Sequence, residues 1–226
     1  MSPSFGDANY GVMYTPPAFR EDDPDELRAM IRGAGLATVI TATVNGLVAT
    51  HVPLLLDETE GPMGTLYGHL ARANPQWTLE PAGEALAIFA GPDAYVTPSW
   101  YASKREHGKV VPTWNYDAVH AYGPVEFFED KERLHAVVAR TTELYERPRA
   151  EPWAVSDAPG AFIDAQLRGI VGLCLQITRI EGKRKMSQNR PSADRDGVAA
   201  GLSASGRDED RRVAALVAGK RASSSS

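Results

Sequence analysis

The segment LATVITATVNGLVATHVPLLL, residues 36–56, decides the fold class. It consists of two apolar runs, residues 36–44 and 47–56, with Asn45-Gly46 between them. Asn-Gly between two apolar runs is the strongest short-range signal for a β-hairpin, because both central residues of its turn need a positive φ angle. The segment therefore predicts two antiparallel strands, and Pro53 places the second strand at a sheet edge or a bulge.

The rest of the chain predicts more strands and a few helices. Strands are expected over residues 64–70, 85–90, 119–128 and 170–180, with a short continuation at 95–97. Gly91-Pro92 is expected to end its strand, and Gly123-Pro124 to mark a bulge or kink. Helix starts are predicted at Asp23, Asp130, Asp157 and about Ala193. Six or so antiparallel strands with few helices indicate a barrel or sandwich with helical covers.

The composition is that of an ordinary folded protein of 226 residues, with 43% hydrophobic and 23% charged residues. The net charge of −5 argues against a nucleic-acid surface over the whole molecule.

The single cysteine, Cys174, excludes an intrachain disulfide and is expected to be an inert core thiol. No signal peptide is visible and no apolar run approaches the ~20 residues that cross a bilayer, so a cytoplasmic protein is expected.

The most informative polar stretch is HLARANPQW, residues 69–77. A predicted strand leads into Asn74-Pro75, an N-cap followed by a residue suited to the first helical position. Backbone N–H groups, the helix dipole and the Arg72 guanidinium together predict a site for an anionic group, although a capped helix with a solvated arginine fits the same pattern. His69 is either a hydrogen-bonded structural residue or the neighbour of a planar cofactor whose acidic group binds Arg72.

Two other stretches are candidates for a binding surface. Trp and Tyr side chains cluster around prolines in residues 95–101 and 109–116, where packing in a loop or a dimer interface is expected, and residues 102–108 between them are a candidate flap. The run KRKMSQNR, residues 183–190, is either a solvated charged face or a group that reads the polar edge of a heteroaromatic ring through Ser187, Gln188 and Asn189. Its basic side chains would then neutralise a phosphate or an anionic reduced flavin.

Three motifs together resemble the PaiB-like family, whose members are described as FMN-binding negative transcriptional regulators within the FMN-binding split-barrel superfamily. The motifs are GHLARANPQW, FAGPDAYVTPSWYASKREHGKVVPTWNYDAVHAYG and EGKRKMSQNR, and the resemblance runs from about Met13 to Leu202. It implies a mainly β fold, a six-stranded antiparallel split β-barrel of the FMN-binding type, that works as a homodimer with cofactor sites at the subunit interface.

The resemblance also implies a set of cofactor-binding residues. By similarity, the phosphate and ribityl side of FMN would be lined by Thr50, His51, His69, Leu70, Ala71, Arg72 and Asn74. A second group would reach the site from the C-terminal region of the same or the partner subunit: Lys185, Ser187, Gln188 and Asn189. The segments around Trp100 and Trp114 would form walls of the interface and the site.

The resemblance leaves the activity open between a flavin-dependent oxidoreductase, a regulator and a haem enzyme. One PaiB-like branch, the piperazate synthases, uses haem b to form an N–N bond in N5-hydroxyornithine. In that case His69 would be the axial iron ligand, with His51 as second candidate. A repressor that binds DNA directly is the third hypothesis, and the negative charge and the lack of a helix-turn-helix pattern disfavour it.

The expected organisation is one cofactor-binding split-barrel domain over residues 13–205, with helical covers. A flexible extension is expected at residues 1–12, and a C-terminal helix and tail with a disordered end at residues 206–226. No catalytic acid–base pair is recognisable, and none is required if a flavin or haem carries the electron chemistry.

Overall fold

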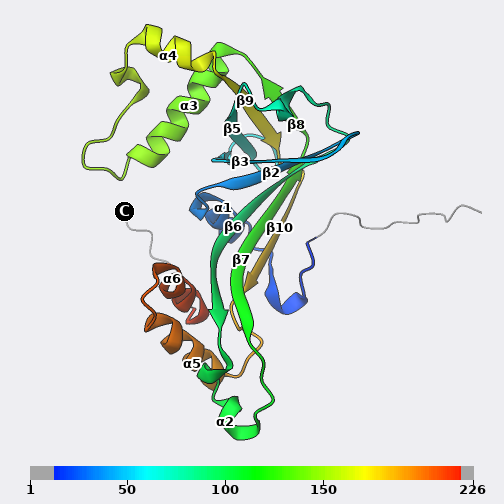
Figure 1. The fold of residues 1–226 in the computed structure, drawn as a ribbon, viewed down its shortest axis with the longest axis vertical. Helices are drawn as coiled ribbons and strands as arrows, with labels where there is room; N and C mark the ends of the chain where they lie inside the picture. Colours follow the sequence, from blue (N-terminus) through cyan, green and yellow to red (C-terminus); the bar gives the residue numbers. More distant parts are fainter. Residues whose placement is uncertain (1–12, 220–226) are drawn as a thin grey trace, which may run out of the picture. The chain divides into compact units, whose positions relative to one another are not determined.

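The computed structural model describes residues 13–219 as a mainly β protein (Figure 1). Its strands are β1 (Arg20–Glu21), β2 (Ala37–Thr43), β3 (Gly46–Val52), β4 (Leu55–Asp57), β5 (Thr65–Ala71), β6 (Ala85–Val96), β7 (Thr113–Gly123), β8 (Val125–Phe128), β9 (Ile170–Gln176) and β10 (Arg179–Lys185). They form a six-stranded sheet in the order β1-β10-β7-β6-β2-β3 and a four-stranded sheet in the order β4-β5-β9-β8. The predicted mainly β, antiparallel fold class is confirmed.

The helices are fewer than the strands. They are α1 (Pro24–Gly33), α2 (Ser103–His107), α3 (Lys131–Glu146), α4 (Gly160–Leu167), α5 (Ser192–Ser203) and α6 (Asp208–Val217). Single 3-10 turns are η1 (Pro17–Phe19), η2 (Pro75–Thr78), η3 (Pro98–Trp100) and η4 (Val155–Asp157). No helix within residues 13–219 is long and apolar enough to cross a membrane.

The chain divides into two compact units. Unit 1 comprises Met1–Asp22, Pro92–Asp117 and Glu181–Ser226, and unit 2 comprises Asp23–Gly91 and Ala118–Ile180. Strands β6, β7 and β10 contribute residues to both units. The single domain over residues 13–205 stays a prediction, and the predicted flexible extension at 1–12 and the last residues of the predicted tail, 220–226, lie outside the described residues.

Unit 2 contains the hairpin that the sequence predicts. β2 and β3 pair from Ala37↔Val52 to Thr43↔Gly46, so the turn centres on Val44 and Asn45. Gly46 has a φ of 115°, but Asn45 does not have a positive φ, so the expectation that both residues adopt one was wrong. The reason is the Thr43 hydroxyl, which accepts a hydrogen bond from the Asn45 N–H at 3.2 Å and donates one to the Gly46 carbonyl at 2.9 Å.

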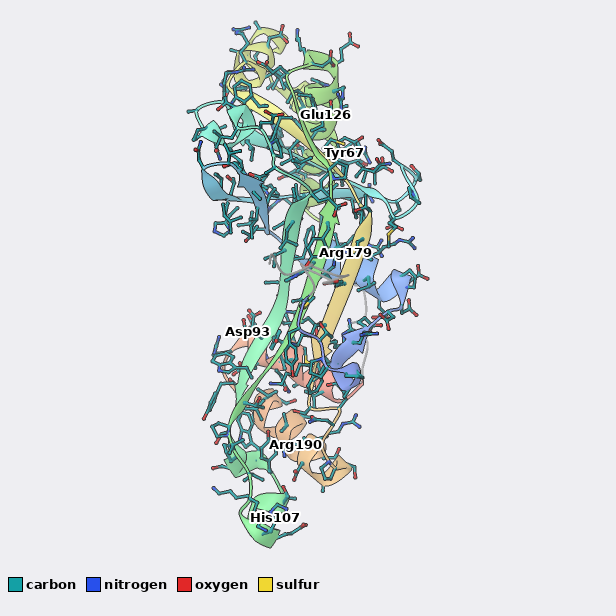
Figure 2. All side chains as sticks on the ribbon, turned by 90° about the vertical axis from the view of Figure 1, so that its right-hand side faces the viewer. Tyr67, Asp93, His107, Glu126, Arg179 and Arg190 are labelled. Atoms are coloured by element: carbon teal, nitrogen blue, oxygen red, sulfur yellow. The ribbon has the colours of Figure 1, made fainter. Side chains whose placement is uncertain are left out.

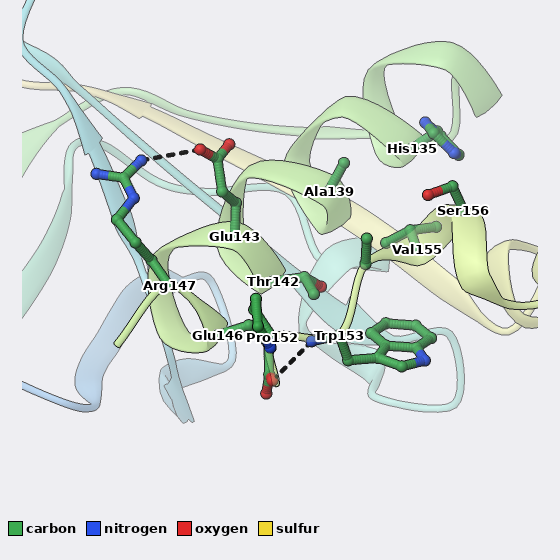
Figure 3. Close-up of a pocket in the computed structure, with 11 residues that line it drawn as sticks. His135, Ala139, Thr142, Glu143, Glu146, Arg147, Pro152, Trp153, Val155 and Ser156 are labelled. Carbon is green, nitrogen blue, oxygen red and sulfur yellow. Dashed lines mark hydrogen bonds and ion pairs between the residues drawn. The ribbon is translucent and has the colours of Figure 1, made fainter. Parts of the chain in front are cut away.

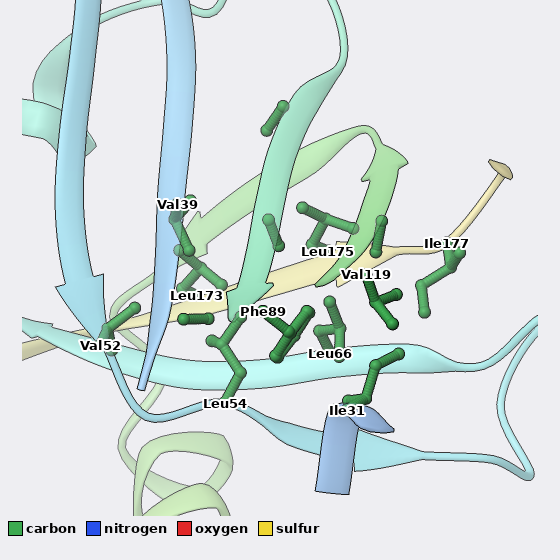
Figure 4. Close-up of a cluster of buried hydrophobic side chains, with 14 of the residues drawn as sticks. Ile31, Val39, Val52, Leu54, Leu66, Phe89, Val119, Leu173, Leu175 and Ile177 are labelled. Atoms are coloured by element: carbon green, nitrogen blue, oxygen red, sulfur yellow. The ribbon is translucent and has the colours of Figure 1, made fainter. Parts of the chain in front are cut away.

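Unit 2 also holds the main hydrophobic core, whose residues come from α1 and from strands of both sheets (Figure 4). Strand β5 contributes Leu66 and Leu70, which are buried, and between them Gly68. A Cβ at Gly68 would lie 2.7 Å from a Leu54 methyl carbon and 2.9 Å from the Pro53 carbonyl oxygen, so only glycine fits there. Because side chains alternate along a strand, Tyr67 and His69 lie on the opposite face.

Five predicted element boundaries differ clearly from the structure. Strand β6 continues through Gly91-Pro92 to Val96, and β7 already begins at Thr113. Gly123-Pro124 separates β7 in one sheet from β8 in the other, and the predicted strand over 170–180 is divided into β9 and β10. Asp157 lies in η4, where its carboxylate accepts from the Ala154 N–H at 2.8 Å, so α4 begins only at Gly160.

Unit 1 has its own smaller core. Met186 at the end of β10, Tyr101 and residues of α5 and α6 are buried together. Helix α2, at the predicted flap, is held at its first residue by Asp194, whose carboxylate accepts from the Ser103 N–H at 2.9 Å and from the Ser103 hydroxyl at 2.7 Å. Figure 2 shows His107, the last residue of α2, at one end of this unit.

Candidate functional site

His69 lies near the end of β5, on the face that packs against α3. The side chain is half-buried, and burial alone lowers the pKa of its imidazole below the ordinary value of 6.5. Within residues 13–219 the imidazole forms no hydrogen bond or ion pair. A neutral, partly buried imidazole with free ring nitrogens is suited to accept or donate a hydrogen bond to a ligand, or to coordinate iron.

A cavity of about 270 Å³ opens beside His69. Its other walls come mainly from α3 and carry aliphatic, hydroxyl, aromatic and carboxylate groups: Val138, Thr141, Thr142, Tyr145, Glu146 and Trp153. A larger cavity of about 560 Å³ lies between α3 and residues 152–156, and it shares Thr142, Glu146 and Trp153 with the first (Figure 3). The larger volume lies within the range of small-molecule and cofactor sites.

Sequence reasoning missed the α3 side of this site. The pattern along α3 indicated only a packing face, and Leu134 and Val137 are indeed buried. Tyr145 is 42% exposed and Trp153 is 45% exposed, so neither belongs to the core. The only available signal was an aromatic residue in a polar, proline-containing segment, and this signal is too common to indicate a site.

Arg72 directly follows β5, and its guanidinium is held by contacts with other residues of the protein. Its Nε donates to the Arg168 carbonyl at 2.7 Å, its Nη2 donates to the Ile170 carbonyl at 3.2 Å, and Nη1 forms an ion pair with Glu129. The guanidinium also lies 5.7 Å from the centre of the Trp77 ring. These contacts fix the start of β9 to the end of β5, so Arg72 has a structural function whether or not it also contacts a ligand.

The predicted helix after Asn74 is the single 3-10 turn η2. Asn74 caps it as expected, since its side-chain oxygen accepts from the Gln76 N–H at 2.9 Å. One turn has too few aligned peptide dipoles to provide the anion site that the sequence predicts at a helix start. The buried Gln76 side chain instead donates to the Thr41 hydroxyl at 3.2 Å and anchors the turn to the sheet.

The structure brings Thr50 and Asn74 together, because the Asn74 side-chain amide donates to the Thr50 hydroxyl at 2.8 Å. His51 is exposed on β3, the edge strand of its sheet, and its Nδ1 lies 2.9 Å from the Thr38 hydroxyl. Leu70 is buried in the core, whereas Ala71 is exposed at the end of β5. The side chain of Leu70 is therefore not available for a ligand, and only its backbone can serve the predicted role.

The second predicted group lies in unit 1. Lys185 Nζ donates to the Thr113 hydroxyl at 2.6 Å, and Ser187 is buried and exchanges hydrogen bonds with Asn115 at 3.0 and 3.2 Å. Gln188 folds back on its own turn, since its Oε1 accepts from the Met186 N–H at 2.6 Å. Asn189 is exposed. Ser187 and Gln188 thus build the turn, and Asn189 presents its amide to solvent.

Cys174 is half-buried on β9, where the sheet register pairs it with Tyr67 on β5 and with Glu126 on β8. Burial raises the pKa of its thiol above the ordinary value, so the reactive thiolate is disfavoured, as expected for a structural cysteine. In the described part of the chain, no group of three His, Cys, Asp or Glu side chains is arranged to hold a metal ion.

Comparison with known proteins identifies the class. Residues 13–179 match the family described as "Putative FMN-binding domain". The chain is 35% identical over 183 residues to the protease synthase and sporulation protein PAI 2 of Bacillus subtilis, covering 80% of this chain and 85% of that protein. It is 34% identical over 241 residues to an uncharacterized protein of Emericella nidulans, covering 91% and 96%. The solved FAD and heme binding protein from Mycobacterium smegmatis superposes with a TM-score of 0.55 at 15% identity, over 80% of each chain.

The mainly β, antiparallel fold with its two sheets is that of the split-barrel class of proteins. Within that class, the chain belongs to the FMN-binding domain family and is a homologue of the Bacillus PaiB protein. The resemblance that the three sequence motifs indicate is confirmed. The likeness to the mycobacterial structure, at 15% identity, supports the split-barrel fold alone.

Proposed function

We propose that this protein binds FMN at the cavity beside His69 and acts as a flavin-dependent oxidoreductase or regulator. The observation that carries the proposal is the unpaired imidazole of His69, half-buried against a cavity next to α3. Membership of an FMN-binding domain family supports flavin as the first candidate. We further propose that the protein works as a homodimer with the cofactor at the interface between two copies.

The residues around the cavity fit the ring of a planar cofactor. Val138, Tyr145 and Trp153 supply aliphatic and aromatic surface, and His69 supplies a neutral hydrogen-bonding group at the ring edge. The flavin, when bound, supplies the hydride and electron chemistry, and the protein orients the ring and limits the access of water to it. Because burial lowers the pKa of its imidazole, His69 stays neutral near pH 7, and it would donate a hydrogen bond from its ring N–H or accept one at its other ring nitrogen.

Haem b is the second candidate, and the same imidazole favours it. A neutral histidine with no competing hydrogen bond is the ordinary axial ligand of haem iron. The mycobacterial structure of the same fold is described as binding both FAD and haem. With haem, we propose an N–N bond-forming enzyme of the piperazate-synthase type, with His69 as the axial ligand.

The absorption spectrum of the purified protein decides between the two candidates, because flavin and haem absorb differently. Bound FMN should give a yellow protein and quenched flavin fluorescence, and haem should give a Soret band. His69→Ala should weaken FMN binding about tenfold, as expected for loss of one ring contact, or abolish the Soret band if the cofactor is haem. His107→Ala is the matched control, since His107 is exposed on α2 and lines neither cavity. A protein that binds neither cofactor, or binds one equally well without His69, would refute the proposal.

A further inference from the structure

The larger cavity, of about 560 Å³, runs along one face of α3 (Figure 3). Four of its lining residues are spaced four, three and four positions apart, which places them on the same face of the helix: His135, Ala139, Thr142 and Glu146. The two middle positions carry small side chains, so the space between the helix and residues 152–156 stays open. The cofactor proposed above lies in the smaller cavity, and the larger cavity has no ligand assigned to it.

The opposite wall, residues 152–156, has a fixed backbone. The Trp153 N–H donates to the Glu146 carboxylate at 3.0 Å, and the Ala154 N–H donates to the Asp157 carboxylate at 2.8 Å. The Trp153 side chain nevertheless stays 45% exposed and lines both cavities. A preorganised wall with an accessible aromatic ring suits ligand binding, because little conformational entropy is lost when the ligand binds.

The two carboxylates that line the cavity are already paired with arginines. Oε1 of Glu146 lies 3.2 Å from Nε of Arg149, and Oε1 of Glu143 lies 2.8 Å from Nη2 of Arg147. The remaining ionisable lining residue, His135, is exposed, and an exposed imidazole is mainly neutral above pH 7. A charged ligand would therefore lose hydration without meeting a carboxylate or guanidinium that is free to pair with it. The lining favours a ligand without net charge.

The rest of the lining combines apolar surface with two hydroxyl groups. The apolar residues are Ala139, Pro152, Trp153, Ala154 and Val155. Thr142 on α3 and Ser156 on the opposite wall add hydroxyls, each of which can donate or accept a hydrogen bond. Because aromatic rings pack well against an indole ring, a planar aromatic ligand that carries an oxygen substituent would use both kinds of surface.

The two cavities adjoin, since Thr142, Glu146 and Trp153 line both. A ligand in the larger cavity would therefore lie next to the molecule bound beside His69. This position suits a substrate, because the reacting atoms of a substrate and a cofactor must approach each other closely.

We infer that the larger cavity binds a neutral, planar aromatic molecule that carries a hydroxyl or carbonyl oxygen. Trp153 is its stacking surface, and Thr142 and Ser156 are its hydrogen-bonding groups. The binding of this ligand follows from residues of unit 2 alone and does not depend on whether FMN or haem lies beside His69. Only its role as a substrate rests on the proposed function.

The test uses three naphthalenes that differ in charge at about pH 7.5: neutral 2-naphthol, anionic 2-naphthoate and cationic 2-(aminomethyl)naphthalene. Isothermal titration calorimetry of the purified full chain without cofactor measures their affinities. The protein should bind 2-naphthol about tenfold more tightly than either ion, since each ion gives up hydration without gaining a partner of opposite charge. Equal affinities for the three molecules, or tighter binding of an ion, would overturn the inference.

A variant that fills the cavity tests its location. Ala139→Leu should weaken the binding of 2-naphthol at least tenfold, because the larger side chain occupies the middle of the cavity, and leucine favours a helix, so the variant should fold. Ala136→Leu is the matched control, since Ala136 is exposed on the same helix and lines neither cavity. Undiminished binding of 2-naphthol by folded Ala139→Leu would contradict the assignment of the ligand to this cavity.

A second pair of variants tests the stacking surface. Trp153→Ala should weaken the binding of 2-naphthol severalfold, whereas Trp153→Phe keeps an aromatic ring and should keep most of the affinity. Circular dichroism shows whether both variants are folded. Equal affinities of the two folded variants would show that the ligand does not stack on the ring of residue Trp153.

The outcomes also separate this inference from the proposed function, because Ala139 lines only the larger cavity and His69 only the smaller one. Loss of 2-naphthol binding in Ala139→Leu, with normal binding in His69→Ala, would support the inference even if the protein binds neither FMN nor haem. Loss of 2-naphthol binding in His69→Ala but not in Ala139→Leu would place the ligand beside His69 and overturn the inference.

Discussion

The guanidinium of Arg72 forms an ion pair with Glu129 and also donates to the backbone carbonyls of Arg168 and Ile170. The carbonyl contacts hold the residues that lead into β9 against the end of β5. In the protein without ligand, the Arg72 guanidinium, which the sequence predicts to bind an anion, therefore connects the end of β5 to the start of β9. This relationship separates two roles of Arg72 that the sequence pattern alone cannot distinguish.

Arg72→Ala should destabilise the cofactor-free protein by about 1–2 kcal/mol, because two backbone carbonyls lose their hydrogen-bond donor. Glu129→Gln should change the stability by less than about 1 kcal/mol, since an exposed ion pair contributes little. Urea unfolding of the cofactor-free variants measures both effects. If Arg72→Ala is as stable as the wild type and only its affinity for the ligand falls, Arg72 binds the ligand and does not stabilise the contact between β5 and β9.

Asp194→Ala should destabilise unit 1 by about 2–3 kcal/mol. The Asp194 side chain is 1% exposed and accepts two hydrogen bonds from Ser103, and such bonds to a charged group are among the stronger ones. Ser103→Ala should cost less, because the bond from the Ser103 N–H remains. Thermal unfolding of the two variants gives the comparison, and equal losses in both would contradict the importance of the backbone bond.

The Asp194 carboxylate should also make the free energy of unfolding depend on pH. Burial raises the pKa of Asp194, but the hydrogen bonds from Ser103 together outweigh burial and lower it below the ordinary value of 3.8. The stabilisation is therefore present above about pH 4 and is lost as the pH falls through the lowered pKa of the folded protein. Below about pH 4, the free energy of unfolding should therefore fall less steeply with falling pH in Asp194→Asn than in the wild type.

The sequence predicts local features better than it predicts partners. Asp23 and Asp130 cap α1 and α3 as expected, because a cap depends on residues two or three positions away. The continuation of β6 through Gly91-Pro92 and the break between β7 and β8 at Gly123 depend on contacts with distant strands. A Cβ at Gly123, for example, would lie 1.8 Å from the Gln176 carbonyl oxygen, and no local sequence pattern reveals this contact.

The same limit applies to the candidate site. The alternation along β5 places His69 on one face, but the identity of the opposing wall depends on how α3 packs against β5. The sequence motif identifies Arg72 as a candidate binding residue, but it does not reveal the ion-pair partner Glu129, which is 57 residues away in the sequence. The sequence therefore predicts which residues carry polar chemistry, and the tertiary contacts decide which of these groups remain free.

Gly201→Ala should destabilise the protein by about 1–3 kcal/mol, although alanine favours a helix. A Cβ at Gly201 would lie 2.3 Å from an atom of the Trp100 ring, so the indole or α5 must shift. Gly33→Ala is the matched control, because Gly33 ends α1 and no atom lies within 4 Å of its added Cβ. Chemical denaturation should show a loss for the first variant and no loss for the second. A neutral Gly201→Ala would show that the Trp100 ring is free to move.

His69 should make the stability of the cofactor-free protein depend on pH between about 7 and 5. The imidazole of the unfolded chain ionises near pH 6.5, and burial lowers the pKa in the folded protein. In the window below 6.5 the unfolded chain binds more protons than the folded one, so the free energy of unfolding falls as the pH falls through this window. Below the lowered pKa of the folded protein the loss levels off.

His69→Gln removes this titration and should flatten the profile between pH 7 and 5, whereas His135→Gln, at an exposed position, should leave the wild-type slope. Denaturant titrations at a series of pH values measure the slope directly. Equal slopes in the wild type and in His69→Gln would mean that the imidazole is solvated and titrates normally in the folded protein. It would then lack the neutral character on which both the flavin and the haem proposals depend, so this measurement tests the site without any cofactor.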